Sequence, residues 1–387
     1  MWRRVLIALA VLALVLAGAG LTKRDDIARL MAVNTLFDED RIVANFSGMD
    51  ALFHAAPMPL PMSEPSPLPR GAPAALPDGA AEWIAERHVT ALVVLKDGAV
   101  AFEEYYLGTG PDDLRISWSV AKSFLAALFG LSVADGSIAS LDDPVTKYAP
   151  ALAGSAYDGA SIRNVLNMAS GVAFDEDYLD FWSDINKMGR VVALGGSLDD
   201  FAAGIDASAG PPGSAFRYVS IDTHVLAMVL RGATGRTLPD LMAERLFAPL
   251  GLERSPYYLT DGEGVAFALG GLNLTTRDYA RFGQMILQGG AWQGEQILPA
   301  AWVTEMTRQS APPAADGMTL GYGYQWWLPE DARPGEVFAI GVYGQWIWID
   351  RAAGVVIARN AADRDFLEPG VLEENIAMFR AITEAVQ

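Results

Sequence analysis

Ser117-Trp118-Ser119-Val120-Ala121-Lys122-Ser123 opens an apolar helix that we predict to run from Ser119 to Ala134. At the start of a helix, residues three apart project from the same face, so the Ser119 hydroxyl and the Lys122 amine can meet. A lysine packed into an apolar helix start loses solvation, which lowers its pKa and lets it act as a base. The helix N-terminus also favours an oxyanion at the serine. Ser119 is therefore a candidate nucleophile and Lys122 a candidate base, although a surface Ser/Lys pair would show the same spacing.

A second candidate element lies about 100 residues further on, at Tyr218-Val219-Ser220, just after the turn-rich stretch 210–214. No other Tyr-x-Ser or Tyr-x-Asn occurs in the chain. A tyrosine hydroxyl near a lysine can pass a proton to a leaving group, and a serine two residues on can support that hydrogen-bond chain. Taken alone, Tyr218 would also fit a half-buried aromatic side chain at a helix start.

The composition restricts the chemistry before any fold is known. The chain has 387 residues, no cysteine, three histidines and 47 acidic against 28 basic side chains, which gives a net charge of −19. Without cysteine there are no disulfides, thiolate zinc sites, iron–sulfur clusters or cysteine nucleophiles. The acid excess argues against nucleic acid as a partner, because phosphate binding needs clustered Lys and Arg. We therefore expect no metal and no cofactor, and look for the chemistry among Ser, Lys, Tyr and carboxylates.

The N-terminus predicts export. Arg3 and Arg4 precede an unbroken aliphatic run, Val5 to Leu16, which is followed by Ala17-Gly18-Ala19. A cationic start, an apolar run and a small-residue site describe a secretory signal peptide, but the apolar stretch is also just long enough for a retained anchor. We expect residues 1–22 to be one or the other. The protein is then periplasmic or anchored in the cell membrane, and touches the membrane only through this segment.

Residue patterning divides the remaining chain into an N-terminal extension, residues 23–80, and one domain, residues 81–387. The extension contains a proline-rich segment from Pro57 to Pro77, which is typical of an extended approach to a domain. The domain begins with two β-rich runs around Asp97-Gly98, a strong hairpin signal.

The order of elements inside the domain predicts its fold class. Mostly helical sequence forms a predicted lobe at roughly 135–305. The β-signal returns in 321–327 and in the runs that follow it, before an amphipathic helix from about 373 to 386. We expect an α+β fold in which N- and C-terminal strands build one antiparallel sheet flanked by helices, with an inserted all-helical lobe beside it.

Together the Ser-x-x-Lys and Tyr-x-Ser motifs resemble those of the serine β-lactamase and penicillin-binding superfamily. The resemblance extends from about residue 80 to 385 and looks strongest to the class C-like esterases and 6-aminohexanoate-dimer hydrolases. The further stretches that carry it are 142–145 (DDPV), 165–171 (VLNMASG), 247–252 (FAPLGL), 270–272 (GGL) and 276–283 (TRDYARFG). It implies a β-lactamase-like fold and an acyl-enzyme on Ser119, with proton transfer by Lys122 and Tyr218 and support from Ser220.

The family's third motif, usually Lys-Thr-Gly or His-Thr-Gly, corresponds here to Ala339-Ile340-Gly341. The missing cation, which in the family helps bind the carboxylate of β-lactams and D-Ala-D-Ala peptides, argues against a β-lactamase or cell-wall carboxypeptidase. Gly341-Val342-Tyr343-Gly344-Gln345 instead resembles the Gly-x-x-Gly-Gln of the dimer hydrolases. By this resemblance the backbone N–H groups of Ser119 and Val342 hold the oxyanion.

The same resemblance implies four substrate-binding residues. Tyr178 stands where the dimer hydrolases carry a loop tyrosine that reaches the scissile amide, and Gly341 and Tyr343 belong to the third motif. Trp327 is a candidate wall of the acyl pocket. A surface position for Tyr178 and simple core packing for Trp327 are the competing interpretations.

These expectations define an exported serine hydrolase that acts on a small-molecule ester or linear amide. The alternatives are a β-lactamase or D-Ala-D-Ala-type peptidase, and a non-catalytic envelope binding protein of the same fold. A Ser-His-Asp hydrolase is disfavoured because no Gly-x-Ser-x-Gly occurs and the nearest stretch, 130–134, lies inside the helix that Ser119 opens. We expect His54, His88 and His224 to be structural.

Overall fold

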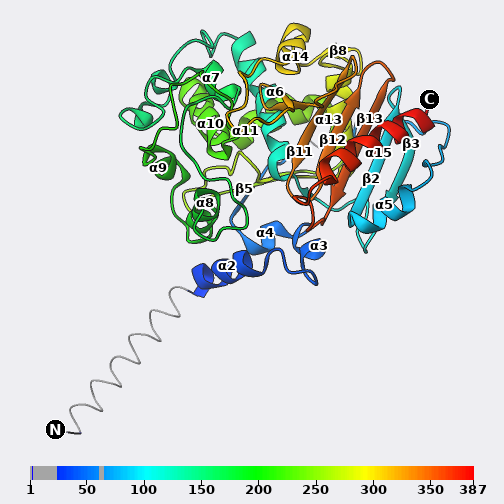
Figure 1. The fold of residues 1–387 in the computed structure, drawn as a ribbon, viewed down its shortest axis with the longest axis horizontal. Helices are drawn as coiled ribbons and strands as arrows, with labels where there is room; N and C mark the ends of the chain where they lie inside the picture. The colour runs from blue at the N-terminus through cyan, green and yellow to red at the C-terminus, as the bar shows by residue number, and fades with distance from the viewer. Residues whose placement is uncertain (1, 3–23, 61–64) are drawn as a thin grey trace.

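The structure of the chain is a computed structural model that describes residue 2, residues 24–60 and residues 65–387. The predicted signal peptide or anchor, residues 1–22, lies outside the described residues except for residue 2. Within those residues, no helix combines the length and the apolar character needed to cross a membrane. Figure 1 shows a twisted sheet with helices on both faces and a mainly helical lobe beside it.

The main sheet has seven antiparallel strands in the order β3-β2-β13-β12-β11-β10-β9. Strands from the two ends of the domain meet in its middle, where β13 pairs with both β2 and β12. The strands are β2 (Val89–Lys96), β3 (Ala99–Tyr105), β9 (Gly321–Gly323), β10 (Trp326–Leu328), β11 (Glu336–Gly341), β12 (Gln345–Asp350) and β13 (Val355–Ala361). The predicted α+β fold, with one antiparallel sheet built from N- and C-terminal strands, is confirmed.

Side chains on the central strands alternate between two apolar cores, as a sheet covered on both faces requires. On β12, Ile347 belongs to the core beneath α13 (Thr276–Leu287). Its neighbour Trp346 belongs to the opposite core, beneath α15 (Val371–Ala385). The short helix α5 (Ala80–Glu86) covers the same face as α15. The sheet is therefore fixed from both sides.

The lobe consists mainly of short helices. They are α7 (Ile162–Leu166), α8 (Asp184–Ala193), α9 (Leu198–Ala203), α10 (Ser220–Thr234), α11 (Leu238–Met242), α12 (Ala248–Leu250) and α14 (Ala300–Met306). A π-helical turn joins α11 to α12.

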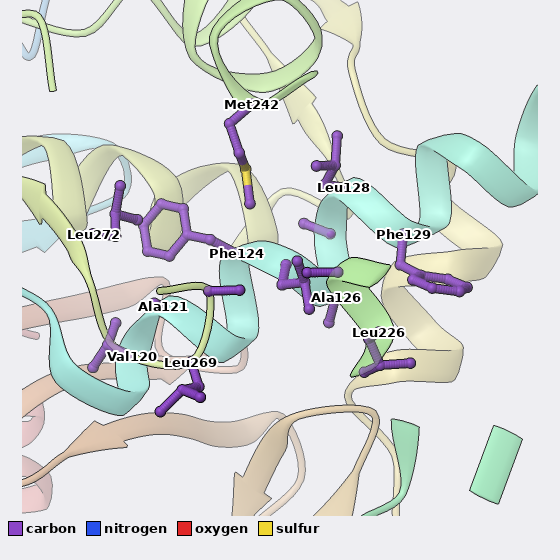
Figure 2. Close-up of a cluster of buried hydrophobic side chains, with 14 of the residues drawn as sticks. Val120, Ala121, Phe124, Ala126, Leu128, Phe129, Leu226, Met242, Leu269 and Leu272 are labelled. Atoms are coloured by element: carbon purple, nitrogen blue, oxygen red, sulfur yellow. The ribbon is translucent and has the colours of Figure 1, made fainter. Parts of the chain in front are cut away.

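The centre of the lobe is α6 (Ala121–Ala134), the helix that follows the Ser-x-x-Lys motif. Every residue from 121 to 132 is buried, which is expected of a helix that is apolar on all sides. Figure 2 shows Leu226 of α10 and Met242 of α11 pointing towards it. An added Cβ at Gly130 would lie 2.2 Å from the ring of Trp302 in α14, so this position has no room for a larger residue.

The β-rich stretch 321–327 forms a hairpin of two short strands, β9 and β10. Tyr324 and Gln325 have φ angles of 27° and 69°, and they reverse the chain between β9 and β10. Two-residue turns with positive φ normally use Asn or Gly. The Tyr-Gln pair therefore gave no turn signal in the sequence.

A second, four-stranded sheet in the order β1-β5-β6-β4 interrupts the lobe that we expected to be all-helical. Its strands are β1 (Ala55–Pro57), β4 (Arg115–Ile116), β5 (Tyr257–Leu259) and β6 (Leu272–Leu274). Strands of two or three residues are too short to show apolar alternation. This sheet matters for function because β4 leads directly to Ser119.

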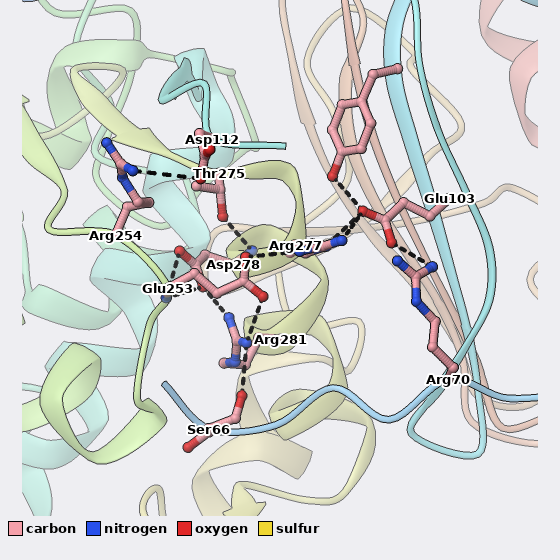
Figure 3. A network of polar contacts seen from close by, with 11 residues as sticks. Ser66, Arg70, Glu103, Asp112, Glu253, Arg254, Thr275, Arg277, Asp278 and Arg281 are labelled. Carbon is pink, nitrogen blue, oxygen red and sulfur yellow. Dashed lines mark hydrogen bonds and ion pairs between the residues drawn. The ribbon is translucent and has the colours of Figure 1, made fainter. Parts of the chain in front are cut away.

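A polar network ties α13 to the sheet and to the segment that resumes at residue 65 (Figure 3). Arg277 of α13 pairs with Glu103 of β3 at 2.6 Å. Arg281 pairs with Asp278 and donates to the backbone oxygen of Ser66 at 2.9 Å. Because both members of the Arg281–Asp278 pair are fully buried, removing either one would cost about 3–5 kcal/mol. The network therefore fixes the helix that supports the sheet behind the site.

Candidate active site

The turn that carries Ser119 is strained and is held in place by aromatic rings. β4 leads into a 3-10 turn, Trp118–Val120, which continues directly into α6. Trp118 has a φ of 43°, a conformation that bulky residues rarely adopt and that costs about 1–3 kcal/mol. The rings of Phe37 and Phe46 lie 5.9 and 5.6 Å from the Trp118 ring. They hold the turn so that Ser119 stands at the N-terminus of α6.

Lys122 lies beside Ser119, and its amine contacts three oxygen atoms. Nζ lies 2.8 Å from Oγ of Ser119, 3.3 Å from Oγ of Ser220 and 3.0 Å from the carbonyl oxygen of Leu269. The residue is only 2% exposed. Burial lowers the pKa of Lys122 to about 7, although the nearby charge of Glu176 acts in the opposite direction. A large fraction of the amine is therefore neutral near pH 7 and able to accept the serine proton.

Tyr218 and Ser220 come from the start of α10. The amine of Lys122 lies 5.2 Å from the centre of the Tyr218 ring. Burial raises the pKa of Tyr218, and hydrogen bonding with Ser119 and Ser220 opposes this rise in part. The hydroxyl is therefore protonated at neutral pH and can donate a proton. The structure brings together the four residues for which the sequence predicted proton transfer.

The structure adds an acidic residue, Glu176, that the sequence analysis did not single out. Its carboxylate accepts the backbone N–H of Ser220 and, at 3.2 Å, the hydroxyl of Ser220. Burial raises the pKa of Glu176, while the charge of Lys122 and hydrogen bonds from Ser220 and Tyr178 lower it in part. Glu176 stands between Asp175 and Asp177. In such an acidic loop, spacing alone does not distinguish one carboxylate from its neighbours.

The end of β11 lies directly against the turn of Ser119. A Cβ added at Gly341 would lie 3.0 Å from the backbone nitrogen of Ser119 and 2.6 Å from the carbonyl oxygen of Ser117. Val342 follows Gly341, and both Val342 and Ser119 line the same cavity. In the described part of the chain, the N–H groups of Ser119 and Val342 have no hydrogen-bond partner. Two unpaired N–H groups beside a serine hydroxyl can hold a developing oxyanion.

A cavity of about 330 Å³ opens in front of Ser119. Of the predicted substrate-binding residues, Tyr178 and Tyr343 line it. Tyr178 also approaches the hydroxyl of Ser220 and the carboxylate of Glu176 from the loop before α8. Apart from Arg190, the lining is otherwise mainly apolar, so the cavity suits a mainly apolar group.

The N-terminal extension forms one wall of this cavity. Its helices are α2 (Arg24–Thr35), α3 (Ile42–Asn45) and α4 (Met49–Leu52). Phe37 stacks on Tyr343 with ring centres 4.5 Å apart and planes 15° from parallel. The lining residues from the extension are Val33, Asn34, Leu36, Phe37, Met49 and Phe53. No sequence pattern connects this segment with the site, because it lies far from the motifs.

Two predicted substrate contacts lie elsewhere. The Trp327 ring packs against Tyr218, with centres 5.4 Å apart, and against Tyr322 at 4.7 Å. Trp327 is not part of the cavity wall as the structure describes it, so the expectation that it walls the acyl pocket is corrected: it supports Tyr218 from behind. Gly341 does not line the cavity either. Its missing side chain lets β11 approach Ser119.

The histidines take no part in this arrangement, and His224 illustrates why. It is fully buried in α10 and its Nε2 lies 2.8 Å from Oδ1 of Asp199. Among the described residues, no group of three or more His, Cys, Asp or Glu side chains could hold a metal ion. The chemistry available at this site is that of a serine, a lysine, two tyrosines and a carboxylate.

A serine hydroxyl against a buried lysine, placed between a helical lobe and the strands of an antiparallel sheet, points to the class of serine hydrolases with a β-lactamase-like fold. The sequence profile of the β-lactamase family matches residues 80–374. The chain belongs to this family, which confirms the predicted superfamily.

Individual relatives agree with this assignment. The chain is 33% identical to the 6-aminohexanoate-dimer hydrolase of Paenarthrobacter ureafaciens over 288 residues, which cover 71% of this chain and 73% of the relative. It is 29% identical to penicillin-binding protein 4 of Amycolatopsis lactamdurans over 297 residues, 65% of this chain and 74% of the relative. A solved structure from Bacillus anthracis, provisionally described as a 6-aminohexanoate-dimer hydrolase, shares the fold with a TM-score of 0.77 at 23% identity. The superposition covers 90% of this chain and 95% of that one.

Proposed function

We propose that this protein cleaves an ester or a linear amide through an acyl-enzyme on Ser119. The observation that supports this most is the 2.8 Å distance between Nζ of Lys122 and Oγ of Ser119, combined with the burial that lowers the pKa of Lys122 to about 7. Lys122 takes the hydroxyl proton as Ser119 attacks the carbonyl carbon, and the N–H groups of Ser119 and Val342 stabilise the oxyanion. Tyr218, supported by Ser220, protonates the leaving group, and water then releases the acyl group.

The site favours a substrate whose acyl part is uncharged. The third-motif position holds Ala339, which has no cation for a substrate carboxylate, and the cavity beside Ser119 is mainly apolar. The dimer hydrolase among the relatives supports an amide as one possible substrate class. Ester and amide hydrolysis need the same proton transfers, so the choice between them depends on the cavity.

The experiment combines active-site labelling with a substrate panel. The full chain is treated with a fluorophosphonate probe and assayed against short esters, linear amides and a cephalosporin. We expect labelling and ester or amide turnover in the native protein, and neither in Ser119→Ala or Lys122→Ala. Ser132→Ala, a serine of the same helix outside the site, is the control and should behave as the native protein does.

The same panel separates the alternatives. Preferential turnover of the cephalosporin would favour a β-lactamase or D-Ala-D-Ala-type peptidase, an activity to which the penicillin-binding relative lends some support. A Ser119 that no probe labels would favour a non-catalytic binding protein. The buried Lys122 and the unpaired N–H groups argue against that outcome, because a binding protein has no use for either.

The cellular location follows from the sequence of residues 1–22. A cationic start and an aliphatic run support export, with the protein either released to the periplasm or held in the cell membrane. Fractionation of cells that express the full chain, with sequencing of the mature N-terminus, distinguishes a cleaved signal from a retained anchor.

A further inference from the structure

Exposed apolar side chains gather at the mouth of the candidate active site. The described residues contain ten exposed large apolar side chains, and six of them lie on α2 or between residues 179 and 194. These six, which we name the apolar rim, are Ile27, Met31, Leu179, Phe181, Trp182 and Leu194. On the surface of a soluble protein, exposed apolar residues normally occur singly. A group of them therefore indicates an interaction site.

The two segments that carry the rim pack against each other through α2 and α8. Figure 1 shows α2 and α8 at the same end of the molecule, and the two helices are in contact. Arg29 of α2 donates from Nε to the carbonyl oxygen of Ala193, the last residue of α8, at 3.0 Å. Ile27 and Met31 are four residues apart in α2, so they share one helix face. The rim therefore lies on two neighbouring segments that are far apart in the chain.

The rim is continuous with the cavity in front of Ser119. Leu179 and Phe181 line that cavity although they are 81% and 53% exposed. The next residue, Trp182, is 70% exposed and makes an edge-to-face contact with Phe181 at 4.9 Å. Apolar side chains therefore connect the rim to the wall of the cavity.

We propose that the apolar rim docks on the surface of a lipid bilayer and that the site takes its acyl substrate from that bilayer. The sequence before α2 indicates that the partner of the rim is a lipid bilayer. In that stretch, residues 5–16 are entirely aliphatic and follow Arg3 and Arg4. α2 begins at Arg24, so the rim is the part of the described body nearest in sequence to this lipid-soluble segment. Exposed Trp, Phe and Leu side chains are those that bury favourably at the headgroup boundary.

The charges near the rim favour an uncharged lipid surface. Arg24 and Lys187 are balanced by Asp25 and Asp184, with which they form ion pairs, and Arg190 lies over the rings of Phe181 and Trp182. The whole chain carries a net charge of −19, so an anionic bilayer would repel it. The docking is therefore apolar in origin, and phosphatidylcholine vesicles are the appropriate probe.

The docking half of the proposal can be tested without any enzyme assay. Because the chain has no cysteine, Trp182→Cys and Leu194→Cys each provide a single site for an environment-sensitive fluorophore. Leu107→Cys, at a residue that is 55% exposed outside the rim, is the matched control. On full-length chain bound to phosphatidylcholine vesicles, the probes at 182 and 194 should shift to shorter wavelength and be quenched by nitroxide-labelled lipid. The probe at 107 should do neither. Probes that stay in water at all three sites, or a chain that does not bind the vesicles, would overturn the docking surface.

The substrate half rests on the proposed hydrolase function. The test uses a rim variant in which Ile27, Met31, Trp182 and Leu194 are all replaced with Ser. In the control variant, Leu107 and Met318 are replaced with Ser. We expect the rim variant to hydrolyse a water-soluble acetate ester normally but a long-chain ester in vesicles about tenfold more slowly or worse, since even one buried apolar side chain is worth that factor. Equal rates on the vesicle ester would refute delivery from the bilayer. If no ester is hydrolysed while the probes at 182 and 194 enter lipid, the hydrolase function fails and the docking surface stands.

Discussion

The amine of Lys122 and the carboxyl group of Glu176 lie together in a buried part of the site. Four hydroxyl groups lie beside them, those of Ser119, Tyr178, Tyr218 and Ser220. Burial moves both groups towards their neutral forms, lowering the pKa of Lys122 and raising that of Glu176, while their mutual attraction favours the ion pair. Two groups so close titrate as a pair. Ser220 stands between them, with its hydroxyl 3.3 Å from the amine and 3.2 Å from the carboxyl group. The protonation state of the Lys122–Glu176 pair decides whether a neutral amine is present to accept the proton of Ser119.

The first prediction concerns the pH dependence of turnover. Because the pKa of Lys122 is lowered to about 7, the amine is an ammonium at lower pH and cannot accept the proton of Ser119. kcat/KM should therefore rise with pH through about 7 and level off above it. The measurement is a pH–rate profile on a short ester, with Lys122→Arg as a variant that should stay inactive up to pH 9. A rate that is already maximal at pH 5 would contradict lysine as the base.

Glu176→Gln gives the second prediction. The charge of Glu176 raises the pKa of Lys122, so the uncharged amide should move the rising limb of the pH profile to lower pH while it still accepts from Ser220. Glu176 is therefore a positioning residue that acts through Lys122 and Ser220. Asp177→Asn, an exposed position in the same loop, is the control and should leave the profile unchanged. An unshifted profile in Glu176→Gln would show that the carboxylate only holds the loop.

Among the secondary-structure elements, the decisive contact is the one between the end of β11 and the turn before α6. The strand supplies the N–H of Val342 and the turn supplies that of Ser119, and both groups border one cavity. Their separation is set by Gly341, because β11 can approach the turn only where no side chain intervenes. The proposed oxyanion site thus depends on the packing of two elements that are more than 200 residues apart in the chain.

Gly341→Ala tests this packing. The added Cβ would lie 2.6 Å from the carbonyl oxygen of Ser117, so β11 or the turn has to move. A displacement of about 1 Å at reacting groups costs roughly 10²-fold in rate, and we expect kcat to fall by that order while the melting temperature changes little. Gly110→Ala is the control, since Gly110 has nothing within 4 Å and no positive φ. Normal kcat in Gly341→Ala would mean that the N–H of Val342 is not an oxyanion donor.

The elements also show what sequence patterns can and cannot predict. α6 and the hairpin of β2 and β3 were predicted because their apolar runs and the Asp97-Gly98 turn are local signals. The hairpin of β9 and β10 was missed because Tyr324 and Gln325 adopt positive φ only where tertiary packing imposes it. For the site, the motifs identified Ser119, Lys122 and Tyr218. Glu176 and the wall from the extension are contacts between distant segments, which no local pattern contains.

For the whole molecule, the main electrostatic feature is a net charge of −19 on a body that also buries ionisable groups. Asp222 in the first turn of α10 is fully buried, and Tyr157 donates to its Oδ1 at 2.7 Å. Burial raises the pKa of Asp222 from 3.8 to about 7. In the described residues, its Oδ2 has no hydrogen-bond partner. The folded protein therefore favours the protonated form of this residue.

The titration of Asp222 and the repulsion among the surface charges change the stability in the same direction. Between pH 4 and 7 the folded state holds a proton on Asp222 that the unfolded state has lost, so the free energy of unfolding falls as pH rises through this window. From pH 5 to 8 the loss from Asp222 should reach up to about 2–3 kcal/mol. Self-repulsion of the growing negative charge adds to it. Urea unfolding at pH 5 and pH 8 measures the total change in the free energy of unfolding. Repeating it at high salt separates the two contributions, because salt screens the repulsion of exposed charges but hardly affects a buried group. Asp222→Asn should reduce the part that salt leaves, since the amide keeps an acceptor for Tyr157 without a charge. An Asp222→Asn variant whose stability changes between pH 5 and pH 8 as much as that of the native protein would show that the pKa of Asp222 is not raised in the fold.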